Sequence, residues 1–150
     1  SDLGEALFIP TGAVHAYVSG LGIEIMSSSD NVLRAGLTPK HIDAGEALRC
    51  MDFHGAPPVR IAPEMNGRGT GIYYAPVDDF ELSVSKIIGG EWIPIPGRGP
   101  RILLGVSGEL EVGAGGSTEV IHRGQAVFVA DSEGMMRARG NGTLAQAGVP

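Results

Sequence analysis

The sequence predicts an all-β protein with one short helix. Glycine and proline are frequent, with 24 and 10 residues in a chain of 150, and so many helix-breaking residues exclude long helices. Short apolar or alternating segments between turn residues recur through the second half of the chain, which is typical of a β-sandwich or a small barrel. Hydrophobic residues make up 43% of the chain, which is enough for a core and argues against global disorder.

Charge and cysteine content exclude several classes of function. The formal net charge is −6, from 11 basic and 17 acidic residues with no basic run, which disfavours binding to nucleic acid or to an anionic membrane. No apolar run approaches the roughly 20 residues of a membrane helix, and the acidic start is unlike a signal peptide. Cys50 is the single cysteine, so we expect a cytoplasmic protein without an intrachain disulfide. Because the chain begins directly before an expected strand, we also expect a fragment of a larger fold.

Three short strands are expected in the first third of the chain. Glu5–Ile9 reads as a buried strand, and His15–Ser19 and Ile23–Met26 read as a hairpin around a glycine-rich turn. A two-residue turn places Glu24 on the same face as His15, whereas a three-residue turn places them on opposite faces, because strand side chains alternate. A glycine at the first central position suits a type II′ turn, which favours the two-residue alternative.

A helix is expected next. Thr38 and Pro39 have the character of an N-cap and a first helical residue. Ala44, Leu48 and Met51 then follow at helical spacing, so we expect about three turns with these side chains facing inward.

The rest of the chain reads as a connection followed by strands. Residues 55–70 are rich in proline and glycine, which is typical of a linker or a long crossing loop. Ser107-Gly108 and Gly113–Ser117 supply turns between the strands that follow. The expected strands after residue 72 are Phe80–Ser85, Arg101–Val106, Glu109–Val112, Glu119–Ile121 and Ala126–Val129.

One motif points to a metal ligand. Gly4-x5-Pro10-x-Gly12-x2-His15 turns the chain sharply and aims the next strand, so that an imidazole can point into a barrel. Neutral imidazole is a good ligand for zinc, iron or nickel, although a lone histidine can equally be a core residue bonded to a backbone carbonyl. The motif resembles the second conserved motif of the cupin superfamily, which implies a cupin jelly-roll (double-stranded β-helix) barrel. A degenerate copy, Gly124-x5-Ala130-x-Ser132-x2-Met135, has lost the proline, the glycine and the histidine.

The remaining histidines do not complete a metal site. A catalytic zinc ion takes about three protein ligands, whereas His41, His54 and His122 are scattered and form no ligand pair. We therefore expect the missing ligands in sequence that precedes Ser1.

A second group of motifs is more specific. His15-Ala16-Tyr17, Gly22-Ile23-Glu24 and the segment 29–40, SDNVLRAGLTPK, together resemble the type I phosphomannose isomerase (mannose-6-phosphate isomerase) family. The resemblance implies that His15 is a zinc ligand, that Glu24 is an active-site carboxylate, and that Arg34 and Lys40 are active-site cations. It also implies a phosphorylated hexose as substrate and a missing N-terminal half of the same protein as partner.

The chemistry of such a reaction suits these residue types. Exchange of mannose 6-phosphate and fructose 6-phosphate moves a proton between adjacent carbons, which needs an acid–base group, an electrophile and cations for the phosphate. Glu24 would shuttle a proton or orient a hydroxyl, and Arg34 would act at the phosphate or near the reacting carbons. The plainer interpretations are that Arg34 and Lys40 form a solvated face, and that Asp30 and Asn31 are turn formers.

Together these observations give a domain assignment. Residues 1–54 are expected to end a catalytic cupin, with the active-site loop and the short helix, residues 55–70 to be a linker, and residues 71–150 to form a degenerate cupin barrel without a metal site. The isolated chain is expected to have little activity and weak metal affinity. Two alternatives remain: another metal-dependent cupin enzyme, such as a dioxygenase, and a non-catalytic sugar-binding or interaction cupin.

Overall fold

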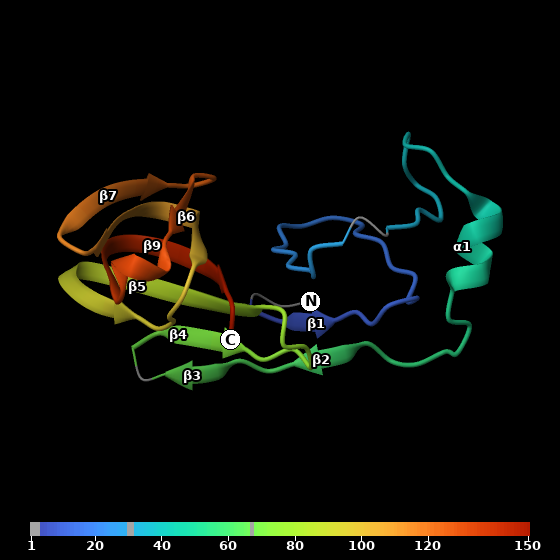
Figure 1. Cartoon of the computed structure of the whole chain (residues 1–150), viewed down its shortest axis with the longest axis horizontal. Coiled ribbons are helices and arrows are strands. Elements are labelled where there is room, and N and C mark those ends of the chain that lie inside the picture. The colour runs from blue at the N-terminus through green and yellow to red at the C-terminus, as the bar shows by residue number, and fades with distance from the viewer. Residues whose placement is uncertain (1–3, 30–31, 67) are drawn as a thin grey trace. The chain divides into compact units, whose positions relative to one another are not determined.

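A computed structural model of the chain describes residues 4–29, 32–66 and 68–150. It confirms an all-β protein with one α-helix (Figure 1). The chain divides into two compact units, Ser1–Arg60 and Ile61–Pro150. No helix in the described ranges has the length and apolar character needed to cross a membrane.

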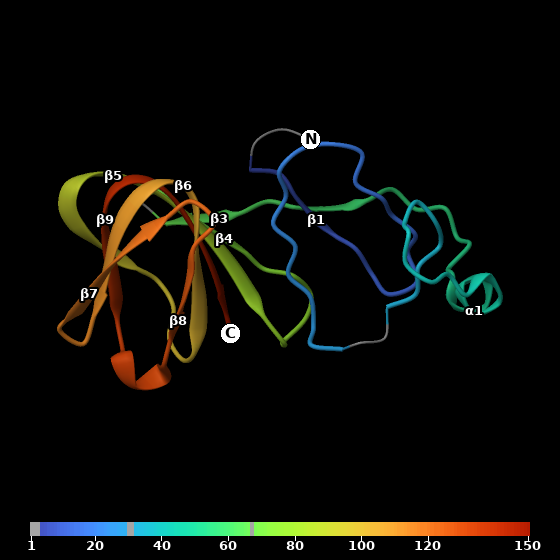
Figure 2. The ribbon, with the colours of Figure 1, turned by 90° about the horizontal axis from the view of Figure 1, so that it is seen from above.

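The described residues of the second unit form a seven-stranded antiparallel sheet. The sheet curls strongly upon itself (Figure 2). Its strands, in spatial order, are β3 (Glu64–Asn66), β4 (Thr70–Tyr73), β5 (Glu81–Ile95), β9 (Met136–Gly148), β6 (Arg101–Ala114) and β7 (Ser117–His122), with β8 (Ala126–Val129) also paired to β6.

The core of this unit lies between the curled strands. Alternate side chains of each strand point inward, because successive residues of a strand face opposite sides. Removing apolar side chains from water in this way is the main force that closes the sheet. The buried cluster comprises Ile87, Ile95, Leu103, Leu110, Val112, Ile121, Val129, Met136, Ala138 and Leu144.

The turn expected at Ser107-Gly108 is wrong. Strand β6 continues through these residues and stays paired with β9, with a register shift between Gly105 and Ser107. Gly108, which follows this shift, has a φ of +72°, a conformation that L side chains rarely adopt. A Cβ at Gly108 would also collide with the backbone carbonyl of Asn141. Glycine is therefore required here by a positive φ and a close backbone approach within a strand, and not by a hairpin.

The degenerate repeat is visible in the backbone. Gly4 and Gly124, which head the two copies, have φ angles of +89° and +82°. In the second copy β8 leads through a 3-10 turn, Asp131–Glu133, into β9, as the repeat predicts. In the first copy, strand β1 (Ala6–Phe8) leads into a turn closed by a bond from the Ala13 amide to the Pro10 carbonyl, 3.2 Å.

The hairpin expected after this turn is not formed. Residues 13–29 contain no strand in the structure, although β1 itself pairs with β2 (Val59–Ile61). The physical reason is that an isolated two-stranded hairpin is marginal in water without a third strand or a packed face. The side chain of Val18 is 98% exposed, which shows that this segment lacks such a neighbour. Strand β1 is also less buried than expected, since Leu7 is exposed.

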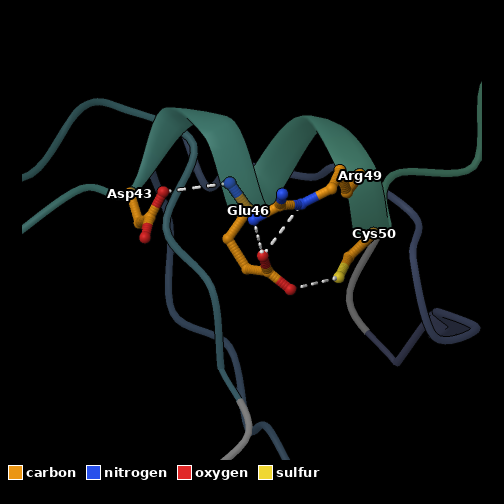
Figure 3. Close-up of polar contacts among 4 residues, drawn as sticks. All are labelled: Asp43, Glu46, Arg49 and Cys50. Carbon is orange, nitrogen blue, oxygen red and sulfur yellow. Dashed lines mark hydrogen bonds and ion pairs between the residues drawn. The ribbon is translucent and has the colours of Figure 1, made fainter.

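The helix begins later than the sequence predicted. Helix α1 spans Ala44–Cys50, and its N-cap is Asp43, whose carboxylate accepts a bond of 2.9 Å from the Glu46 amide (Figure 3). Thr38 is not the cap, since its hydroxyl oxygen instead accepts a bond of 3.2 Å from the Lys40 amide. Asp followed by Glu three residues later resembles a capping box, a signal that competes with the Thr-Pro pair.

The predicted buried face of the helix is also wrong. Ala47 is the buried residue of α1, whereas Leu48 is exposed. Glu46 holds two partners on this helix: it accepts hydrogen bonds from the Arg49 guanidinium and, at 3.6 Å, from the Cys50 thiol (Figure 3). These side-chain contacts and the cap stabilise a short helix that has little core to pack on.

The stretch expected to be a linker contains strands. β2, β3 and the start of β4 fall within residues 55–70. The assignment of residues 1–54 to a catalytic cupin and of residues 71–150 to a metal-free barrel stays a prediction.

We expect Leu110→Ala to destabilise the second unit. Leu110 is fully buried, and truncating a buried leucine to alanine typically costs about 2–5 kcal/mol. Chemical denaturation monitored by Trp92 fluorescence measures this loss. Ile88, on the exposed face of β5, is the control, and Ile88→Ala should change the free energy of unfolding by less than about 0.5 kcal/mol. Equal effects of both substitutions would contradict this description of the core.

Candidate functional site

His15 is placed by the turn that precedes it. Gly12 has a φ of +86°, and a Cβ there would lie 3.1 Å from the Cys50 carbonyl oxygen. The Gly12 carbonyl also accepts a bond of 3.0 Å from the Asp52 amide. The turn is therefore fastened to the chain that leaves α1, and only glycine permits this close approach. This explains the glycine of the motif in physical terms.

The tautomer of His15 follows from its local contact. The Nδ1 atom lies 3.2 Å from the Ala13 carbonyl oxygen. Since a carbonyl oxygen only accepts hydrogen bonds, Nδ1 carries the proton in this arrangement. The lone pair of a neutral imidazole is then on Nε2, which is the usual arrangement for a metal-binding histidine with a carbonyl partner.

Glu24 faces this free nitrogen. The Oε1 atom of Glu24 lies 4.0 Å from Nε2 of His15, and the two side chains are 56% and 43% exposed. The structure thus places both side chains on one side of the bend, as the two-residue turn predicted, although the flanking residues form no strands. An imidazole and a carboxylate at this separation form a polar pair that is open to solvent on one side.

Tyr17 is a third member of this group that the sequence reasoning did not single out. Its ring meets the imidazole of His15 edge-on, with centroids 5.8 Å apart and an interplanar angle of 80°. Partial desolvation raises the pKa of the Tyr17 hydroxyl, and the charge of Glu24 and a hydrogen bond to it raise the pKa further. The signal available in the sequence was the spacing of two residues from His15, which puts both side chains on one face of an extended segment.

The two cations predicted from the sequence, Arg34 and Lys40, form no ion pair with Glu24 within the described ranges. Arg34 is half-buried and Lys40 is exposed. Within the described ranges, no ion pair involves either cation. Asp30 and Asn31, the expected turn formers of the same segment, lie outside the described residues. The structure therefore brings His15, Tyr17 and Glu24 together, and among the residues it describes neither cation forms an ion pair with Glu24.

Among the described side chains that could coordinate a metal, His15 can serve as one ligand, but they do not form a complete metal site. His15 offers a free Nε2, as a zinc ligand requires. However, no group of three or more His, Cys, Asp or Glu side chains that could hold a metal ion occurs among the residues that the structure describes. Two other histidines are engaged elsewhere: His54 with Asp52 at 2.7 Å, and His122 with Glu109 at 3.3 Å.

Comparisons with known proteins place the chain. No model of a protein family matches it. Mannose-6-phosphate isomerase of Escherichia coli strain K12 is 34% identical over 144 residues, which cover 95% of this chain and 37% of the relative. Mannose-6-phosphate isomerase 2 of Arabidopsis thaliana is 35% identical over 128 residues, or 84% of this chain and 29% of the relative. The chain therefore spans about a third of the length of the curated relatives it matches.

Comparison with solved structures gives the same family as comparison of the sequences. The Salmonella typhimurium mannose 6-phosphate isomerase, in a crystal structure bound to its substrate and a zinc atom, matches with a TM-score of 0.70 and 33% identity. The match covers 83% of this chain and 32% of that one. The apo form of the same protein matches with the same TM-score and identity.

The antiparallel β architecture and these neighbours define the class of the protein, which is a cupin fold. The chain is homologous to the C-terminal part of the mannose-6-phosphate isomerases. This confirms the resemblance that residues 4–40 carry.

We expect Glu24→Gln to lower the pKa of Tyr17. The carboxylate opposes ionisation of the phenol through its charge and its hydrogen bond, so removing the charge lets the hydroxyl ionise at lower pH. A pH titration by NMR of ring-labelled tyrosine measures the change. The control is Glu119→Gln, on β7 of the other unit, which should leave the Tyr17 titration where it is. An unchanged Tyr17 titration in Glu24→Gln would show that the two groups do not interact.

Proposed function

We propose that this chain is the C-terminal portion of a zinc-dependent mannose-6-phosphate isomerase, an enzyme that interconverts mannose 6-phosphate and fructose 6-phosphate. The observation that carries the proposal is the pair formed by a free Nε2 of His15 and the carboxylate of Glu24. This pair lies in a chain whose relatives along 95% of its length are mannose-6-phosphate isomerases.

Each residue of the pair has a distinct role in this proposal. His15 is one zinc ligand through Nε2, and its Nδ1–H bond to the Ala13 carbonyl fixes the ring orientation. Zinc, when bound, would supply a Lewis acid for the substrate oxygen. Glu24 holds or moves a proton at its carboxylate, and Tyr17 orients that carboxylate by donating a hydrogen bond to it. Glu24 is thus the acid–base or hydroxyl-orienting group.

Arg34 and Lys40 are the proposed phosphate-binding cations. Neither is committed to a carboxylate within the described ranges, so both remain able to bind an anion. Arg34 is the stronger candidate, because a guanidinium makes two parallel bonds to a phosphate group more readily than an ammonium does.

The separation of His15 and Arg34 in the sequence supports the roles proposed for them. Two of the matching Salmonella structures are phosphomannose isomerase variants in which a histidine and an arginine, nineteen positions apart, were each replaced by alanine. His15 and Arg34 are also nineteen positions apart.

The proposal requires more polypeptide than this chain supplies. The remaining zinc ligands would come from the portion of the protein that precedes the matched region in the relatives, and a phosphorylated hexose would bind between the two portions. Residues 71–150 would form a second barrel without a metal, since Met135 stands where the repeat has His15. The single cysteine is in keeping with a cytoplasmic protein.

The decisive experiment uses a full-length hybrid, in which the part of the Escherichia coli relative that precedes its matched region is joined ahead of residue 1. We expect the hybrid to isomerise mannose 6-phosphate, and Arg34→Ala to lower kcat/KM by about 100-fold or more, as for removal of a group that stabilises charge in the transition state. A coupled assay of fructose 6-phosphate formation measures the change. Arg123→Ala, at an exposed turn of the second unit, is the control, and unchanged turnover in Arg34→Ala would defeat the assignment.

We also expect zinc affinity to depend on His15. The 150-residue chain alone should bind zinc weakly, because a single imidazole provides only one of about three required protein ligands. Equilibrium dialysis with elemental analysis should give one tightly held zinc ion per hybrid, and His15→Ala should weaken binding at least tenfold. His122→Ala should have no effect. Stoichiometric, tight zinc on the 150-residue chain would contradict the proposal.

A further inference from the structure

A cavity of about 220 Å³ in the second unit has a cationic lining. Arg68 and Arg98 both line it, and none of the described lining residues is an aspartate or a glutamate. Within the described ranges, neither arginine forms an ion pair. The formal net charge of the chain is −6, so this cavity is a local exception in an acidic protein, and its charge favours an anionic ligand.

Arg98 lies on a loop that buried polar side chains hold in place. The carbonyl oxygen of Pro96 accepts a bond of 2.6 Å from Nε2 of Gln146. The carbonyl oxygen of Gly99 accepts a bond of 3.1 Å from Nη1 of Arg101. Gln146 is 4% exposed and Arg101 is 2% exposed. The backbone is therefore fixed on both sides of Arg98 by side chains that solvent hardly reaches.

Gln146 lies directly behind the lining of the cavity. A Cβ at Gly97, one of the lining residues, would lie 2.5 Å from Nε2 of Gln146. Oε1 of Gln146 and Nε of Arg101 are buried atoms for which the structure shows no hydrogen-bond partner. Buried polar atoms are rarely left in this state, so two of them beside the loop that lines a cavity indicate a place for a polar ligand.

Arg101 also ties this loop to a second wall of the cavity. Its Nη2 atom donates a hydrogen bond to the carbonyl of Gly134, the residue before Met135, which lines the cavity. Met135 stands where the repeat has His15. The described lining residues include no histidine, cysteine or carboxylate, so their chemistry suits an anion and not a metal ion.

Arg68 is positioned by the turn between β3 and β4. Its amide donates a bond of 2.7 Å to the Asn66 carbonyl, and the Gly69 carbonyl accepts a bond of 2.9 Å from the Lys86 amide of β5. Gly69 has a φ of +84°, and a Cβ there would lie 2.9 Å from the Lys86 carbonyl oxygen. Only glycine permits this approach, and the turn that carries Arg68 is thereby fastened to the sheet.

We propose that this cavity binds a phosphate group, either as inorganic phosphate or as part of a small phosphate ester. A phosphate ester carries a charge of about −1.5 to −2 near neutral pH, which two guanidinium groups balance. Each guanidinium can also make two parallel bonds to phosphate oxygens. A volume of about 220 Å³ is below the roughly 300–1,000 Å³ of pockets for drug-sized ligands, so it suits a phosphate group with a small attachment.

The proposed phosphate site is separate from the proposed catalytic residues. It shares no residue with His15, Glu24, Arg34 or Lys40, so its ligand does not depend on the isomerase assignment. A phosphate group bound there would occupy the second unit without taking the place of a ligand of the first unit.

An NMR titration of the 150-residue chain tests the proposal. Inorganic phosphate and, separately, fructose 6-phosphate should shift the amides of residues 97–99 and Met135 and the Nε–H signals of Arg68 and Arg98 along saturable curves. Equal or tighter binding of inorganic phosphate would identify the free ion as sufficient, and tighter binding of fructose 6-phosphate would identify the ester as the preferred ligand. The absence of saturable shifts at these positions with both ligands would overturn the proposal.

Replacing the cations tests their part in binding. Arg68→Gln and Arg98→Gln should each weaken phosphate binding about tenfold or more, because each removes charge-assisted hydrogen bonds. Arg123→Gln, at an exposed turn of the same unit, is the control and should change the dissociation constant by less than about twofold. Unchanged signals from β5 and β9 show that the variants are folded. Phosphate binding that persists at full strength in both Arg68→Gln and Arg98→Gln would rule out this site.

A matched pair of variants at Met135 tests the location. Met135 is 75% exposed, so polar replacements leave the core intact. Met135→Glu should weaken phosphate binding about tenfold or more, because a carboxylate in the cavity repels the anion and pairs with a guanidinium. Met135→Gln has the same shape without the charge and should bind phosphate within about threefold of the original chain. Equal affinities of the two variants would show that phosphate binds elsewhere, and the proposal would be wrong.

Discussion

The fold of the second unit depends on β9 pairing with two strands at once. β9 bonds to β5 along one edge and to β6 along the other, and it contributes Met136, Ala138 and Leu144 to the core. A strand that is paired on both edges leaves no backbone group unsatisfied, which is the condition for burying it. The last strand of the chain therefore closes the sheet that the earlier strands begin, and the core forms only when it is in place.

The first unit is held by a different kind of interaction. The Gly12 turn is fastened to Asp52, Asp43 caps the helix, and Glu5 pairs with Arg60 at 2.7 Å. These are individual polar contacts, two of them between residues far apart in the sequence, and each is of modest net strength. The Gly12 turn places His15 without burying it, so His15 is positioned by a turn that lies outside the strands.

This difference explains which expectations succeeded. Ala126–Val129 was predicted with its observed bounds, because its apolar run is flanked by turn residues and its neighbours lie within the same chain. The proximity of His15 and Glu24 agrees with the two-residue turn that a glycine at its first central position favoured over a three-residue turn. The expected hairpin failed for the opposite reason, since strand propensity is realised only against a partner, and no pattern within residues 13–29 reveals whether that partner is present.

Two further differences have local causes. The start of α1 was misplaced because Thr38 and Asp43 are both competent caps, and the choice between them is made by the bond from the Glu46 amide to Asp43. The sequence placed Tyr17 in the same motif as His15 without assigning it a contact, and only the geometry shows that its ring meets the imidazole of His15 edge-on. The spacing of two residues in the sequence predicts the direction in which a side chain points, but it does not predict which side chain it contacts.

The contact between Cys50 and Glu46 has a chemical consequence. Desolvation raises the pKa of the Cys50 thiol, the hydrogen bond to the Glu46 carboxylate and its charge raise it further, and Arg49 opposes them only in part. The thiolate is the reactive species toward oxidants and electrophiles, and a raised pKa makes it a smaller fraction of the single cysteine of the chain. An accessible sulfur atom is in this way kept slow to cross-link one molecule to another.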